Sequence, residues 1–164
     1  MTPASNRPDL HRIGVSAFTE VLGTLLSLPV TVPGATNDRP VSDAPDRISS
    51  SVRLTGQRLS GSVHLQLPTA FVAHAVRLLT GLEGDAGNAN ALQDDAAGEL
   101  ANMVAGRVAN QLAADGYSCK LGTPSVSRAH LPTPNQPAFA LVRTDLICAG
   151  HWLSLEIQCC YAVA

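Results

Sequence analysis

The sequence predicts an α+β fold in which a mainly antiparallel sheet has helices packed on one face. Segments whose apolar residues recur at helical spacing, and segments in which apolar and polar residues alternate, follow the order helix, hairpin, two helices and further strands. The 164 residues have the usual size of one domain, and 45% of them are hydrophobic, which suffices for one core. We therefore expect a single domain over residues 1–164.

Capping residues and helix-stopping residues define the first two helices. The first begins at residues 6–9, where Asn-Arg-Pro-Asp is typical of a helix start, and its apolar pattern stops at Pro29. The second helix opens at residues 68–69 and ends at Gly81, which suits the left-handed position after a helix.

The third helix has Asp94 and Asp95 as candidate N-caps and runs to about Asp115, with Gly116 just beyond its end. At about 100° per residue, most apolar side chains fall on one arc, which we expect to face the core. This arc holds Leu100, Met103, Val104, Val108, Gln111 and Leu112, with Arg107 at its edge. The opposite, exposed arc holds Asp95, Glu99, Asn102, Gly106, Ala109, Asn110 and Ala113.

Alternating apolar and polar residues predict the strands. A hairpin is expected from residues 51–55 and 62–67. After the third helix, we expect strand segments within 117–126 and 138–148, and a last strand over 152–161.

Composition argues against several classes of function. The formal net charge is −2 and the pI is about 6.2, and the chain has no basic stripe for nucleic acid and no basic run for a membrane surface. The first residues lack the layout of a signal peptide, and the apolar stretch Val21–Val32 is too interrupted to span a bilayer. We therefore expect a cytoplasmic protein.

The four cysteines and five histidines have no spacing that is typical of a metal site. Cys159 and Cys160 are neighbours on a predicted strand, so their side chains should point to opposite faces. We expect these residues to be packing residues, with no disulfide, no metal and no cofactor of the protein's own.

The exposed arc of the third helix is unusual for a solvated surface, which would carry paired Lys, Arg and Glu. Glu99 and Asn102 instead stand three residues apart above a floor of Gly and Ala. Small residues let another surface approach the helix closely, so we expect Glu99 and Asn102 to enter a cleft on a partner. An exposed Glu-x-x-Asn pair is common on helices, however, and alone is weak support for a function.

At these residues the sequence resembles the CheX-type chemotaxis phosphatases, within the wider family that includes CheC and FliY. The family's helix carries an acidic residue and then Glu-Leu-x-Asn-Met-Ile, with a following Gly, and here residues 95–106 read DAAGELANMVAG. The hairpin residues 56–65, GQRLSGSVHL, resemble the family's glycine-spaced run, and a helix ending in Leu-Thr-Gly at residues 79–81 follows. The sequence has one Glu-x-x-Asn helix rather than two, and in this it resembles CheX more than CheC.

The resemblance implies a CheX-like fold and hydrolysis of the aspartyl phosphate of a CheY-like response regulator. Asn102 would orient the attacking water, because a side-chain amide can donate and accept at once. Glu99 would pair with the receiver's lysine. The receiver would supply Mg²⁺, so the protein needs no cofactor of its own.

Alternatives to this reading remain open at the sequence level. The same fold could bind a receiver without catalysis, or serve as a module related to the flagellar switch. Asn110 and Arg77 could add contacts, although solvated positions explain both. The resemblance also implies a homodimer joined by sheet pairing, with 152–161 or 138–148 as the edge strand. The connections at 33–51 and 131–137 are long and Pro-rich, which leaves the partner and the dimer mode open.

Overall fold

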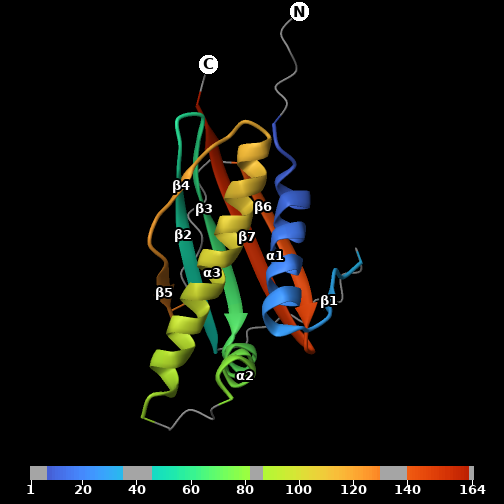
Figure 1. Cartoon of the computed structure of the whole chain (residues 1–164), viewed down its shortest axis with the longest axis vertical. Helices are drawn as coiled ribbons and strands as arrows, with labels where there is room; N and C mark the ends of the chain where they lie inside the picture. Colours follow the sequence, from blue (N-terminus) through green and yellow to red (C-terminus); the bar gives the residue numbers. More distant parts are fainter. Residues whose placement is uncertain (1–6, 35–45, 82–86, 130–139, 163–164) are drawn as a thin grey trace, which may run out of the picture.

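The computed structural model of the chain describes residues 7–34, 46–81, 87–129 and 140–162 (Figure 1). The predicted connection at 131–137 and most of the one at 33–51 lie outside the described residues. The helices are α1 (Leu10–Leu26), α2 (Thr69–Thr80) and α3 (Ala89–Ala114). The strands are β1 (Val30–Thr31), β2 (Arg47–Thr55), β3 (Leu59–Pro68), β4 (Lys120–Leu121), β5 (Ser125–Ser127), β6 (Ala140–Cys148) and β7 (His151–Tyr161).

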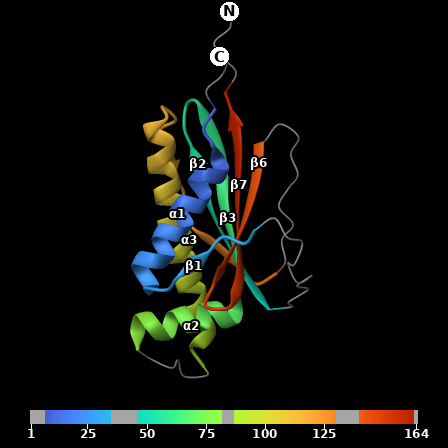
Figure 2. The ribbon, with the colours of Figure 1, turned by 90° about the vertical axis from the view of Figure 1, so that its right-hand side faces the viewer.

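The strands form one sheet in the order β1-β6-β7-β3-β2-β4, and β5 also pairs with β2. Every pairing between these strands is antiparallel. Figure 2 shows α1 and α3 on the same face of the sheet, with α2 across one end. The predicted α+β fold, with helices on one face of a mainly antiparallel sheet, is confirmed for the described residues.

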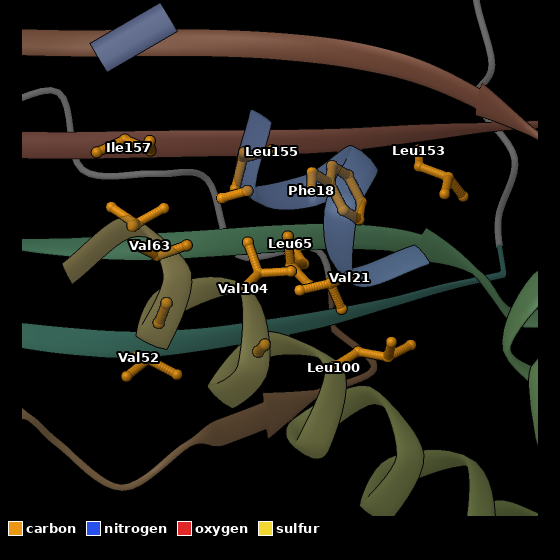
Figure 3. Packing of buried hydrophobic residues seen from close by; sticks show 14 of the residues in the cluster. Phe18, Val21, Val52, Val63, Leu65, Leu100, Val104, Leu153, Leu155 and Ile157 are labelled. Carbon is orange, nitrogen blue, oxygen red and sulfur yellow. The ribbon is translucent and has the colours of Figure 1, made fainter. Parts of the chain in front are cut away.

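The core lies between this face of the sheet and the two long helices (Figure 3). Alternate residues of β2, β3 and β7 point toward α1 and α3, which is the period-two pattern of a half-buried antiparallel sheet. Leu, Val and Ala make up most of the core, in keeping with an aromatic content of only 4%. The fully buried side chains labelled in Figure 3 include Phe18, Val52, Val63, Leu65 and Val104.

The predicted helix limits agree well with the structure for α1 and α2. The carboxylate of Asp9 accepts a hydrogen bond from the Arg12 backbone N–H at 3.0 Å, which caps α1. Ser27 has a left-handed φ of 52° and ends α1 before Pro29. Gly81, with φ of 67°, ends α2 and donates its N–H to the Arg77 carbonyl.

The predicted strands needed three corrections. The hairpin strands are longer than expected, since β2 begins at Arg47 and the turn to β3 occupies only residues 56–58. The segment expected within 117–126 holds the short strands β4 and β5, and β5 runs on to Ser127. The possibility that 152–161 is an edge strand is wrong, because β7 pairs with β3 on one side and β6 on the other.

The far face of β7 is polar but buried, which simple alternation did not predict. Ser154, Glu156 and Gln158 are all buried on the face away from α1 and α3. Arg143 of β6 lies 3.6 Å from the Glu156 carboxylate and donates to the Ser154 hydroxyl at 3.2 Å. Ser154 in turn donates to Asp145 at 2.7 Å. These partners satisfy polar groups that would otherwise be costly to bury.

Gly61 marks a place where two strands approach closely. A Cβ added to Gly61 would overlap the backbone carbonyl oxygen of Gln158 on β7. A Cβ on Gly56, at the hairpin turn, would likewise overlap the Ser118 carbonyl oxygen. The glycine-spaced hairpin run therefore has a steric reason in this fold.

We predict that Gly61→Ala destabilises the protein by roughly 1–3 kcal/mol or more, because strand backbone cannot move aside as a flexible side chain can. Gly23→Ala is the matched control, since Gly23 is an exposed residue of α1 with open space at its Cβ position. That control should gain up to about 1 kcal/mol from helix propensity. Denaturant midpoints of the three proteins measure both effects, and equal midpoints for the two variants would contradict this account.

Candidate functional site

The candidate site lies on α3, which is one continuous helix as predicted but begins earlier than expected. Asp94 and Asp95 are internal residues of the helix, so the prediction that they cap it is wrong. Arg128, just after β5, donates hydrogen bonds to the Asp94 carboxylate at 2.9 Å and to the Asn90 carbonyl at 3.1 Å. This long-range contact joins the first turns of α3 to the segment after β5, and no local pattern in the sequence indicates it.

Glu99 and Asn102 share the outward face of α3, as predicted. Glu99 is exposed and Asn102 is half-buried, whereas Leu100 and Val104 are buried in the core. Within the described residues, neither the Glu99 carboxylate nor the Asn102 amide has a hydrogen bond or an ion pair. Both groups are therefore available to a binding partner, while their role in catalysis remains a prediction.

The buried arc of α3 is wider than the sequence predicted. Ala109 was expected on the exposed arc but is only 8% exposed, and Gly98 is also buried. The cause is the strip formed by β4 and β5, which packs against this side of the helix. A Cβ on Gly98 would lie 3.3 Å from Val126, whereas one on Gly106 would lie 3.9 Å from Leu121 in ordinary contact. Packing within this chain therefore does not require glycine at position 106.

The other side of α3 is covered by α1. Arg107 pairs with Glu20 at 3.2 Å and keeps its head group half exposed, as its place at the arc edge predicted. Gln111, the one polar residue on the predicted core arc apart from Arg107, donates to the Ser16 hydroxyl at 3.2 Å. α3 therefore lies between α1 and the β4–β5 strip. Only a narrow face of the helix is left to solvent, and this face carries Glu99 and Asn102.

The other candidate residues do not join this face as a reactive cluster. The described residues include no group of three or more His, Cys, Asp and Glu side chains that could hold a metal ion. The four cysteines are free thiols, and burial, with smaller effects from Cys119 and Cys160, raises the pKa of Cys159 to about 12. A thiol with so high a pKa is a packing residue rather than a nucleophile. Asn110 and Arg77 are exposed, on α3 and α2 respectively.

Comparison with known families identifies the chain. The family model described as "Chemotaxis phosphatase CheX" matches residues 48–137, which is more than half of the sequence. The chain belongs to the CheX family. The match includes the hairpin, α2 and α3, so it contains both Glu99 and Asn102. The family resemblance seen in the sequence is therefore confirmed.

Solved structures of similar fold include further members of the CheX and CheC group. CheX from Vibrio vulnificus is 18% identical, with a TM-score of 0.77 over 95% of this chain and 99% of that one. A CheX-CheY-BeF3-Mg²⁺ complex from Borrelia burgdorferi contains a chain that is 17% identical, with a TM-score of 0.73 over 94% and 99%. FliY from Thermotoga maritima is 20% identical, with a TM-score of 0.60 over 94% and 87%. At these identities the likeness concerns the fold.

A search of curated proteins gave no match. Among the described helices, none combines the length and the apolar character that crossing a membrane requires.

We predict that Glu99→Ala and Asn102→Ala each change the free energy of unfolding by no more than about 0.5 kcal/mol, because neither side chain contributes to the core. Leu100→Ala is the contrasting variant on the same turn, and its buried side chain should cost about 2–5 kcal/mol. Chemical denaturation of the four proteins tests this, and a large loss in Asn102→Ala would contradict the assignment of that residue to a binding face.

Proposed function

We propose that this protein hydrolyses the aspartyl phosphate of a CheY-like response regulator. The observation that carries the proposal is that an exposed Glu99 and a half-buried Asn102 share one face of α3, with neither polar group paired to another of the described residues. Membership of the CheX family supports the reaction class, and a solved relative in complex with CheY supports the partner class.

The proposed role of Asn102 is to hold the attacking water. Hydrolysis of an acyl phosphate proceeds by in-line attack, and catalysis depends mainly on positioning and on the placement of charge. A carboxamide can accept one hydrogen bond from a water molecule and donate another to the phosphoryl group, so it fixes the direction of attack without acting as a strong base. Asn102 is half-buried on α3, between the core and solvent.

The proposed role of Glu99 is to dock the receiver. Its carboxylate would pair with the receiver lysine that neighbours the phosphoryl group, and so would set the position of Asn102 along the helix. The receiver would also supply the Mg²⁺ ion through its own acidic site, so this chain would contribute no metal ligand.

The central kinetic prediction separates the two residues. Asn102→Ala should lower turnover on the order of 10²-fold or more while leaving receiver affinity nearly intact, since the water contact matters mainly in the transition state. Glu99→Ala should weaken both affinity and turnover, because the lysine contact exists in both states. Asn110→Ala is the matched control, an exposed Asn on the same helix about two turns further on.

The measurements are the lifetime of the receiver's phosphoryl group and the affinity for the phosphorylated receiver. Full activity in folded Asn102→Ala would rule out the proposed mechanism. Unchanged affinity in Glu99→Ala would leave the proposed phosphatase activity standing but would contradict the docking role of Glu99. A wild-type protein that binds the phosphorylated receiver without shortening its lifetime would establish the non-catalytic binding module instead.

We also propose a homodimer formed through β6. Among the described strands, β6 pairs with β1 only at Ile147 and Cys148, so no described strand covers the remainder of this edge. Leu141 on this strand is exposed, and an unpaired apolar edge is a liability unless another chain covers it.

We predict a dimer mass by light scattering at micromolar concentration. Leu141→Lys should shift the protein toward the monomer, because charged residues on edge strands oppose pairing. Leu78→Lys, at an exposed position of α2, is the control and should leave the mass unchanged. A wild-type monomer would exclude the dimer under these conditions.

A further inference from the structure

The first turns of α3 form an overhang, which we define as residues 89–96. None of these residues is buried, and the buried positions of the helix begin at Ala97. Figure 1 shows this end of α3 reaching beyond the ends of the neighbouring strands. Ala96 is half-buried against the core, but the overhang gains less from tertiary packing than the helix beyond it, and a segment of two turns is not stable alone in water. A further contact to the sheet would therefore help to hold the overhang in helical form.

Arg128 supplies that interaction. Its Nε donates to the Asp94 carboxylate at 2.9 Å, and its Nη2 donates to the Asn90 carbonyl and to the Gln93 side-chain oxygen, each at 3.1 Å. The planar guanidinium is suited to such a fork of bonds. Arg128 follows β5, which pairs with β2 at Ser127 and Ser49, so the anchor belongs to the sheet.

The helix needs this anchor because of Gly98. Glycine within a helix costs about 1 kcal/mol relative to alanine, and Gly98 directly precedes Glu99. The Val126 side chain would lie 3.3 Å from a Cβ at this position, so close packing against β5 favours the small residue. The helix therefore has a weak point between the overhang and the Glu99 face.

Loss of the overhang would change the helical position of Glu99. If the helix began at Ala97, the backbone N–H groups of residues 97–100 would lose their intrahelical acceptors, and Glu99 would lie in a fraying first turn. With the overhang formed, Glu99 lies in the interior of a continuous helix, and its Cα–Cβ bond keeps a fixed direction relative to that of Asn102.

We propose that Arg128 is a positioning residue for the docking face: it clamps the overhang of α3 to the sheet and so holds Glu99 within the continuous helix. This inference rests on the proposed function. It assigns Arg128 no contact with the receiver, and its effect on docking passes through Glu99.

The test compares Arg128→Ala and Arg128→Lys with Arg107→Ala. The Arg107–Glu20 pair is a matched control, since it also joins α3 to a neighbouring element at the surface, but on the side facing α1. Hydrogen exchange of the amides of residues 97–100 reports on the clamp. The KM and kcat for release of phosphate from a phosphorylated CheY-like receiver report on docking.

Arg128→Ala should speed exchange at residues 97–100 and raise KM about fivefold, the upper end for one exposed ion pair, with kcat nearly unchanged. Arg128→Lys should raise KM less than Arg128→Ala does, because lysine can pair with Asp94 but cannot form the fork of hydrogen bonds. Arg107→Ala should change neither the exchange rates at residues 97–100 nor the KM.

Two kinds of result, in the exchange rates or in KM, overturn the inference while leaving the proposed function intact. One is unchanged exchange in Arg128→Ala, which would show that the overhang does not depend on the clamp. The other is faster exchange with an unchanged KM, or an equal KM change in Arg107→Ala. A wild-type protein that is inactive toward receivers while its amides at 97–100 remain protected would overturn the proposed function and, with it, the docking role of Arg128.

Discussion

The packing of α3 against the sheet is the interaction on which the rest of this structure depends. Its buried positions cover a wide arc, because α1 packs on one side and the β4–β5 strip on the other. Small residues such as Gly98, Ala101 and Ala105 allow the neighbouring elements to come close. What remains exposed is a narrow strip, and any chemistry on this helix is confined to the residues of that strip.

This constraint places the residues of α3 that stabilise the core and the residues that can bind a partner on opposite faces of the helix. Leu100 and Val104 stabilise the core from one face of the turn that carries Glu99 and Asn102 on the other. Polar residues in the exposed strip can therefore be selected for binding with little effect on stability. Rigidity follows from the same packing, and rigidity matters because a group that orients water is effective only when its own direction is fixed.

Local patterns in the sequence predicted the elements whose limits depend on local chemistry. Asp9 caps α1, Gly81 ends α2, and alternating residues mark β2, β3 and β7, since each signal acts within a few residues. The exposed side of α3 was also predicted for Glu99 and Asn102, because helical periodicity is strong over such a length. The family resemblance, carried by the residues around Glu99 and Asn102, added the fold and the reaction class.

The features that could not be predicted depend on contacts between residues far apart in the sequence. The central position of β7 follows from pairing with both β3 and β6, and alternation alone cannot distinguish a central strand from an edge strand. Ala109 is buried in a helix that packs against distant elements, and the first turns of α3 bond to Arg128, a residue far along the chain. The local pattern was compatible with a central or an edge position for β7, with a buried or an exposed Ala109, and with a start of α3 before or at Asp94.

The start of α3 shows why such a contact matters for function as well as for secondary structure. Asp94 and Asp95 have the residue type of helix caps, and a helix starting there would place Glu99 within the first turns. The bond from Arg128 to Asp94 instead uses that carboxylate as an anchor, and in our proposal it keeps the fraying end away from Glu99. A single long-range ion pair can thus change a residue from the end of a helix to its interior. For a side chain that must meet a partner in one defined direction, that change in position is more consequential than the small stability that an exposed ion pair contributes.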